Sequence, residues 1–188
     1  MYIVLEGVDT VGKSTQVLLL RDVYKDAIFM REPTNSDFGN KIRDLALSCD
    51  INNIAQTLLF MADRANNALN IKENLDKSKL VISDRSFISG VAYGVDLDLD
   101  FLLEMNKKIA PLPNLVVVLH AKENILKKRM NEKYLDSIES NGINYLLSVQ
   151  NRILKIVKIL GIESITIDCN QSENKILKSI INKIDSML

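Results

Sequence analysis

The sequence has no excess of charge and few cysteines, and each absence argues against a class of protein. Among its 188 residues, 24 lysines and arginines balance 24 aspartates and glutamates. No overall charge therefore attracts the chain to nucleic acid or to an anionic membrane. Two cysteines without CxxC spacing are too few for a disulfide framework, so we expect Cys49 and Cys169 to be reduced, packed thiols.

Long apolar runs are also absent. The longest in the second half, Leu115 to Leu119, is far too short to span a bilayer, and Glu6 interrupts the N-terminal run. We therefore expect a cytoplasmic protein with no membrane contact and no signal peptide. The length and a hydrophobic content of 47% suit one domain with a real core, and no repeat or low-complexity linker indicates a second.

The most informative stretch begins at residue 7 and fits the phosphate-binding pattern G-x-x-x-x-G-K-[ST]. It consists of Gly7, Val8, Asp9, Thr10, Val11, Gly12, Lys13, Ser14 and Thr15. With this composition the pattern is expected about 0.002 times by chance. Residues 2–5 predict a buried strand before it and residues 16–21 a helix after it, which is the context that the motif requires.

The residue types in this loop suit a nucleoside triphosphate. Glycines let backbone N–H groups close on the β-phosphate, and the N-terminus of the following helix adds a partial positive charge. Lys13 would reach the β and γ oxygens, and Ser14 would place its hydroxyl on Mg²⁺. All nine residues are therefore predicted to hold the nucleotide.

The rest of the chain predicts strands that alternate with helices. Further strands are expected at 27–30, 79–83, 115–119 and 164–167. In the first half, helices are expected from the loop to about residue 25, at 38–47, at 51–67 and in a shorter helix that ends at 75. In the second half, two weaker helices are expected within 87–109, a long one over 122–160 with an interruption near 133–144, and a last one at 173–187. This alternation predicts an α/β fold, a three-layer α/β/α arrangement with a five-stranded parallel sheet of the P-loop NTPase type.

In such sheets, ligands bind beyond the carboxyl ends of the strands. That edge should gather the phosphate loop, Glu32, the Asp84-Arg85 pair and the segment after Leu119. Asp84 would orient Mg²⁺ or its water shell, or it would cap the following helix, and the two roles are compatible.

Three arginines on separate segments, Arg43, Arg64 and Arg85, suit the binding of a second phosphate, although a single arginine is more often solvated or ion-paired.

The phosphate loop alone is compatible with three classes of protein: a switch GTPase, a motor ATPase and a small-molecule kinase. Residues 182–185 match the guanine-binding pattern Asn-Lys-x-Asp, but apolar residues at helical spacing surround them. We therefore expect Asn182 and Asp185 to face solvent in the middle of a helix.

Taken together, these motifs resemble the bacterial thymidylate kinases, P-loop enzymes that phosphorylate dTMP with ATP. The matching stretches follow the order of that family and cover nearly the whole chain: Glu6 to Thr15, Arg31-Glu32-Pro33, Gly39 with Ile42-Arg43, Leu58 to Ala65, Asp84-Arg85 with Ser89, Ala92 and Tyr93, Leu135-Asp136-x-Ile138-Glu139, and Ile167-Asp168. The resemblance implies a single kinase domain over 1–188, a lid at about 122–145, Mg²⁺ as cofactor, dTMP and ATP as small-molecule substrates, and a homodimer.

The resemblance also implies roles for individual residues at the acceptor site. Phe60 would stack on thymine and Arg64 would hydrogen-bond the base, whereas Arg43 and Arg85 would hold the monophosphate. Tyr93 would lie beside the sugar and disfavour a ribose 2′-hydroxyl by crowding.

Three more residues complete the acceptor site that the resemblance implies. Asp9 would lie near the acceptor sugar and phosphate with Mg²⁺ close by, Glu32 would shape the acceptor end, and Ser89 would contribute to substrate binding. For Phe60, the alternative is a plain core residue, and for Asp9 it is a cap of the loop's turn.

The mechanism that follows needs no strong general base, since a phosphate monoester is already an anionic nucleophile. This fits a chain whose one histidine, His120, we expect to be structural or solvent-facing. Catalysis should consist of alignment and charge neutralisation, with Lys13, Mg²⁺ and arginines such as Arg85 stabilising an in-line transfer.

The phosphate loop departs from some family members, which carry a catalytic arginine two residues before the second glycine, where this chain has Thr10. The compensating cation should come from the lid. We assign it to Arg129, with Lys128 and Lys133 as lesser candidates.

Two further departures concern recognition of the base: Ser86 replaces the usual aromatic residue, and Gly94 stands where a glutamine that helps to bind thymine is common.

The sequence leaves two alternative functions open. One is a deoxynucleoside kinase, whose hydroxyl acceptor would want Glu32 as a base. The other is a nucleotide-dependent switch with no acceptor.

Overall fold

The sheet has five parallel strands. The computed structural model describes residues 1–47, 51–131 and 142–188. The strands are β1 (Tyr2–Glu6), β2 (Ile28–Arg31), β3 (Val81–Asp84), β4 (Leu115–His120) and β5 (Ser164–Asp168), in the order β2-β3-β1-β4-β5. Every neighbouring pair is parallel, which confirms the predicted sheet.

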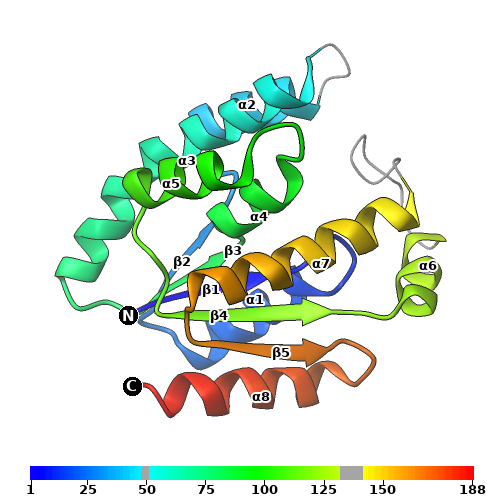
Figure 1. Cartoon of the computed structure of the whole chain (residues 1–188). Helices are drawn as coiled ribbons and strands as arrows, with labels where there is room; N and C mark the ends of the chain where they lie inside the picture. The colour runs from blue at the N-terminus through cyan, green and yellow to red at the C-terminus, as the bar shows by residue number, and fades with distance from the viewer. Residues whose placement is uncertain (48–50, 132–141) are drawn as a thin grey trace.

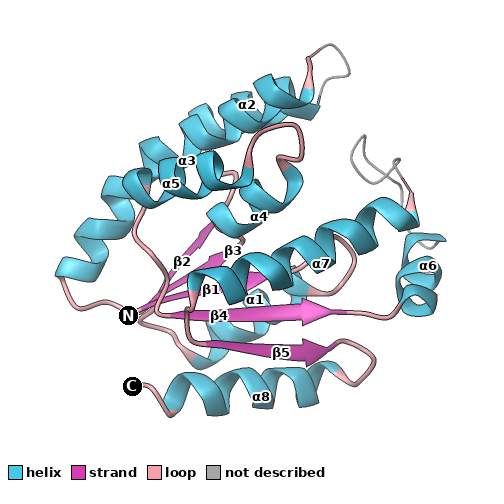
Figure 2. Ribbon diagram, in the orientation of Figure 1, coloured by secondary structure: helices cyan, strands magenta, loops and turns pink. Residues whose placement is uncertain are grey.

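Helices cover both faces of the sheet (Figure 1). Those of the described ranges are α1 (Lys13–Val23), α2 (Asp37–Leu47), α3 (Asn53–Asp76), α4 (Phe87–Tyr93), α5 (Leu99–Ile109), α6 (Glu123–Asn131), α7 (Ile143–Leu160) and α8 (Glu173–Asp185). Helices α1 and α8 pack together on one face, and α3, α4 and α7 lie on the other, with α2 outside α3 (Figure 2). The predicted three-layer α/β/α arrangement is therefore confirmed.

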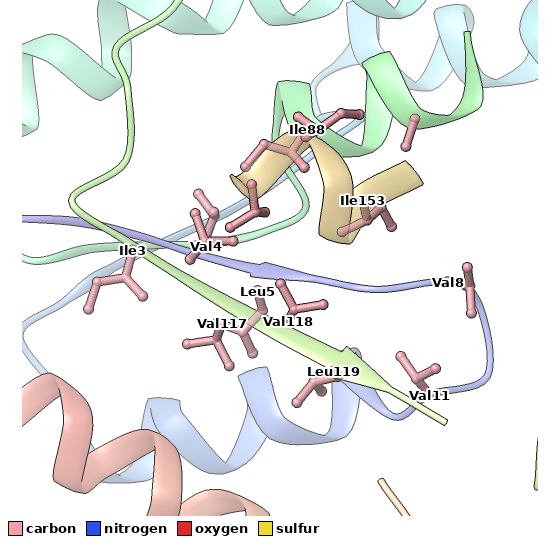
Figure 3. Close-up of a cluster of buried hydrophobic side chains, with 14 of the residues drawn as sticks. Ile3, Val4, Leu5, Val8, Val11, Ile88, Val117, Val118, Leu119 and Ile153 are labelled. Carbon is pink, nitrogen blue, oxygen red and sulfur yellow. The ribbon is translucent and has the colours of Figure 1, made fainter. Parts of the chain in front are cut away.

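The centre of the sheet is buried on both sides because β1 and β4 carry apolar residues at successive positions. Figure 3 shows Ile88 of α4 and Ile153 of α7 over these strands, and Val8 and Val11 of the phosphate loop at the edge of the same cluster. The loop is therefore anchored to the core by its own apolar side chains.

The division of residues 51–75 into two helices was wrong. The structure has one helix, α3, of 24 residues, which begins where the side chain of Asn52 accepts a hydrogen bond from the amide of Ala55. The asparagines at 66, 67 and 70, which weaken the helical pattern in the sequence, lie within it. Packing against α2, α4, α5 and β3 overrides their low helix propensity.

Cys169 is a buried free thiol, and burial raises its pKa to about 11, which keeps it protonated. Asn182 and Asp185 are exposed on α8, as expected, so these residues do not form a guanine site. Cys49, Lys133 and the motif at 135–139 lie outside the described residues.

No helix within the described ranges is both long enough and apolar enough to cross a membrane.

Candidate active site

The phosphate loop joins β1 to α1 through a backbone path that needs glycine at two positions. Gly7 has a φ of 147°, and a Cβ there would lie 2.4 Å from the carbonyl oxygen of Leu119. Gly12, with a φ of 96°, directly precedes α1. Thr10 also has a positive φ, of 69°. The loop therefore curls tightly at the carboxyl end of β1, and its two glycines place no side chain over the backbone.

Lys13 lies beneath this loop. Its side chain is 6% exposed, and Nζ donates a hydrogen bond of 2.8 Å to the carbonyl of Val8. Burial, and then the nearby Arg85, lower the pKa of Lys13 to about 8, while Asp9 and Asp84 act in the opposite direction. The ammonium group is thus held, still charged at neutral pH, at the position where the loop would receive a phosphate.

Ser14 and Asp84 lie together at the carboxyl edge of β1 and β3. The Ser14 hydroxyl donates to Asp84 Oδ2 at 3.2 Å, whereas the buried Oδ1 has no hydrogen-bond partner among the described residues. A hydroxyl beside a carboxylate with an unused oxygen suits Mg²⁺, which prefers oxygen ligands. The cap of α4 is supplied by Ser86, whose Oγ accepts from the amide of Ile88, and not by Asp84.

Arg85 connects the phosphate loop to α4. One guanidinium nitrogen, Nη1, donates to the carbonyl of Gly7 at 3.0 Å and to Ser89 Oγ at 2.9 Å. The other, Nη2, pairs with Asp9 Oδ1 at 2.5 Å. Burial alone lowers the pKa of Arg85, but Asp9 and the other acidic neighbours outweigh it and raise that pKa above its ordinary value. The guanidinium is therefore permanently charged and fixed in place.

The support for Arg85 reaches down to Glu6, a fully buried carboxylate at the end of β1. Glu6 accepts hydrogen bonds from the hydroxyls of Ser86 and Ser89 and from the amide of Ser89. Burial raises the pKa of Glu6. Because the Ser89 hydroxyl already donates to Glu6 and accepts from Arg85, Ser89 serves here to hold Arg85.

A cavity opens beside the phosphate loop, and all eight residues predicted for the acceptor site line it. It is lined by Asp9, Arg31, Glu32, Pro33, Arg43, Leu47, Gln56, Thr57, Phe60, Arg64, Arg85, Ser86, Ser89, Gly90 and Tyr93. The three arginines that the sequence singled out thus meet in one place, although they come from α2, α3 and the end of β3. Tyr93 borders the site of Arg85: its hydroxyl lies 3.4 Å from Asp9 Oδ2, and Arg85 Cζ lies 5.6 Å from its ring centroid.

At the deep end of this cavity, Arg64 and Glu32 form a buried ion pair. They are 2% and 7% exposed. Arg64 Nε donates a hydrogen bond of 2.8 Å to Glu32 Oε2, and Nη2 lies 2.7 Å from the same oxygen as an ion pair. Arg64 Nη1 donates to Asn106 Oδ1 at 2.7 Å. Gly90 makes room for this arrangement, since a Cβ there would lie 2.7 Å from Arg64 Nη2. Arg64 is therefore presented to the cavity in one fixed orientation.

Arg129 reaches from α6 to the phosphate loop. It donates to the carbonyl of Thr10 at 3.0 Å and to the carbonyl of Cys169, just after β5, at 3.1 Å. The guanidinium thus lies at the loop position where the sequence lacks an arginine. Lys128 is exposed, and Lys127 pairs with Glu123 at 2.6 Å on the surface of α6.

Several residues of this site have roles that the sequence did not reveal. Arg31 lines the acceptor cavity, Asn106 fixes Arg64, and Glu6, which had no predicted role beyond its place in a family motif, supports Arg85. One sequence feature could have marked Arg31 and Glu6 as site residues: each is a charged residue at the carboxyl end of a strand. His120 ends β4 and is not among the residues that line the cavity.

Comparisons with known proteins agree on one family. A family model described as thymidylate kinase matches residues 5–180. Proteins named thymidylate kinase from Campylobacter jejuni and Helicobacter hepaticus are 42% and 38% identical to this chain. The first alignment covers 96% of this chain and 97% of the relative, and the second covers both chains completely. A crystal structure of thymidylate kinase from Ehrlichia chaffeensis has the same fold, with a TM-score of 0.78 over 98% of each chain at 21% identity.

Proposed function

The chain belongs to the thymidylate kinase family, and from this premise we propose that it transfers the γ-phosphoryl group of ATP to the phosphate of dTMP, giving dTDP and ADP. The product would supply dTTP synthesis for DNA replication. One observation carries the proposal: a single guanidinium, that of Arg85, bonds the phosphate loop and also lines the acceptor cavity. A protein that only binds a nucleotide has no use for a second basic cavity at that point.

On the donor side, the loop of residues 7–15 would cradle the β-phosphate with its N–H groups, and Lys13 would neutralise the β and γ oxygens. Ser14 and Asp84 would hold Mg²⁺, since their oxygens are adjacent and one of them is unused. When bound, Mg²⁺ supplies further charge neutralisation at the phosphate oxygens. We prefer this pair to Asp9 as the metal site, because the carboxylate of Asp9 is engaged by Arg85.

On the acceptor side, the positive charge of the cavity suits a monophosphate. Arg43 and Arg85 would hold the phosphate, Phe60 would stack on the base, and Arg64 would donate a hydrogen bond to it. The fixed orientation of Arg64 favours recognition of one base edge. Glu32 would act through Arg64, because its Oε2 accepts a hydrogen bond from Arg64 Nε and forms an ion pair with Nη2. This engagement disfavours Glu32 as the base of a nucleoside kinase.

Transfer then needs alignment more than proton movement. Arg85 would stabilise the migrating phosphoryl group from the acceptor side, and Lys13 from the donor side. Arg129 would supply the cation that Thr10 does not, since its guanidinium already lies against the loop at that residue. Only part of its donor capacity is used by the two carbonyls, which leaves N–H groups for phosphate oxygens.

We further propose that residues 1–188 act as one cytoplasmic kinase domain, with a lid at about 122–145, and that the protein is a homodimer. Helices α2 and α3 carry large apolar side chains on their outer surfaces: Phe38, Leu45, Ile54, Leu58 and Leu69. A second copy of this chain covering that surface would remove them from water.

The reaction is tested with purified protein by measuring ADP release with ATP, Mg²⁺ and a panel of acceptors. We expect rapid release with dTMP, slower release with dUMP and background release with thymidine, because the cavity's arginines need a phosphate. Lys13→Met serves as the control that assigns the activity to this site. Activity with thymidine but not with dTMP would support a nucleoside kinase, and nucleotide hydrolysis indifferent to dTMP would support a switch.

The role of Arg129 is tested by Arg129→Ala. The loss of one preorganised positive charge should lower kcat by about 10² to 10³, with a small effect on the KM for dTMP. Lys128→Ala, an exposed neighbour on the same helix, is the matched control and should stay within about twofold of wild type. Wild-type turnover by Arg129→Ala would reject the assignment.

The homodimer is tested by light scattering after gel filtration. We expect a mass near twice that of the 21.2 kDa chain, and a shift to the single-chain mass for Leu58→Glu with Leu69→Glu, which place two charges on the proposed contact. Ile159→Glu, at an exposed position of α7, should leave the mass unchanged. A wild-type protein of single-chain mass at micromolar concentration would contradict the proposal.

A further inference from the structure

We propose that Arg152, on α7, is a positioning residue that fixes Tyr93 at the acceptor site and so sets the selectivity for 2′-deoxyribose over ribose. This rests on the proposed function and on the place that the family resemblance implies for Tyr93, beside the sugar of the acceptor in the cavity that Tyr93 lines. Arg152 itself is not among the residues that line the acceptor cavity. Its influence has to pass through α4, the short helix that carries both Ser89 and Tyr93.

The C-terminal end of α4 depends on donors from outside the helix. The amide of Gly94 closes the helix on the carbonyl of Gly90, but the next amide, that of Val95, donates to Tyr93 and not to Val91. Arg152 fills this gap. Its Nε donates to the carbonyl of Ala92 at 2.9 Å and its Nη2 donates to the carbonyl of Val91 at 3.1 Å.

The choice of arginine fits this task. Two nitrogens of one planar guanidinium bond two successive carbonyls, which a lysine ammonium on a flexible stem does not reproduce with the same geometry. A positive charge at the C-terminus of a helix is also favourable, because the unpaired carbonyls carry partial negative charge there. Arg152 therefore acts as a C-terminal cap that α7 provides for α4, and the two helices pack side by side (Figure 1).

The carbonyls that Arg152 holds belong to the two residues directly before Tyr93. A second contact from α7 reaches Tyr93 itself: the ring of Tyr145 lies 6.2 Å from the ring of Tyr93, centroid to centroid, at an angle of 57°. On its other side, Tyr93 faces Asp9 and Arg85. Tyr93 is thus held between the reacting groups and α7, with Arg152 fixing the backbone and Tyr145 supporting the ring.

The selectivity for 2′-deoxyribose over ribose should depend on how firmly Tyr93 is held. Steric exclusion of one hydroxyl requires that the Tyr93 side chain be held rigidly. A shift of about 1 Å in a positioned group is enough to change reaction rates strongly. Without Arg152, the end of α4 loses two charge-assisted hydrogen bonds, and the backbone that carries Tyr93 is no longer fixed. A 2′-hydroxyl would then fit, whereas Lys13 and Ser14, which would hold the nucleotide, would keep their partners Val8 and Asp84.

The test compares kcat/KM for dTMP with kcat/KM for ribothymidine 5′-monophosphate, together with the KM for ATP. For Arg152→Gln we expect the ratio of the two to fall by about fivefold or more, since hydrogen bonds from a charged group are lost. The KM for ATP should stay within about twofold. Arg152→Lys should give an intermediate ratio, and Lys155→Gln, an exposed position on the same helix, should leave the ratio unchanged.

A reference variant separates this inference from the proposed function. Tyr93→Leu should lower the ratio of kcat/KM for dTMP to that for the ribonucleotide. Adding Arg152→Gln to Tyr93→Leu should lower this ratio no further, because both changes act through the side chain at position 93. If Tyr93→Leu loses selectivity while Arg152→Gln and Arg152→Lys keep the wild-type ratio, the role of Arg152 is wrong and the proposed function stands. If both arginine variants lose activity equally on the two acceptors, Arg152 is structural only, which also overturns the inference. Absence of dTMP turnover in the wild type would instead reject the proposed function.

Discussion

The guanidinium of Arg85 is the contact on which the rest of the site depends. It bonds the carbonyl of Gly7, the carboxylate of Asp9 and the hydroxyl of Ser89, and so joins the phosphate loop to α4. Sheet topology makes this possible. Strand β3 pairs in parallel with β1, and the amide of Arg85 donates to the carbonyl of Leu5 at 2.9 Å, which places Arg85 directly beside the start of the loop.

The same contact explains how the site tolerates buried charge. Lys13 and Arg85 are buried cations, and burial of a charge lowers the stability of the folded protein unless the charge is paired. Asp9, Asp84 and Glu6 surround them and offset that cost. The acceptor end repeats the pattern with Arg64 and Glu32. Positive charge is therefore oriented before any substrate arrives, which is the arrangement that favours a phosphoryl transfer needing little proton chemistry.

Much of this could be predicted from the sequence, for identifiable reasons. The phosphate loop is a local pattern whose glycines are required by the backbone, as Gly7 and Gly12 show. The parallel sheet followed from apolar runs that alternate with helices, and the convergence of Arg43, Arg64 and Arg85 followed from the rule that ligands bind at the carboxyl edge.

The remainder is set by packing between distant segments. Arg152 and Ala92 are 60 positions apart, and no local pattern marks them as partners. Arg64 and Asn106, 42 positions apart, are a similar case. The unbroken α3 was missed because tertiary contacts override the local propensity of its asparagines. Ser89 was predicted to serve substrate binding, and its bonds to Glu6 and Arg85, which depend on the pairing of β1 with β3, could not be foreseen.

Arg85 and Asp9 should act as one unit that links the donor and acceptor halves of the site. A double-mutant cycle on kcat/KM for dTMP tests this coupling most directly, using Asp9→Asn, Arg85→Lys and the double variant. Each single change should cost about 10² or more, and the double variant should lose about as much as the worse single one. Losses that multiply in the double variant would show instead that the two residues act independently of each other.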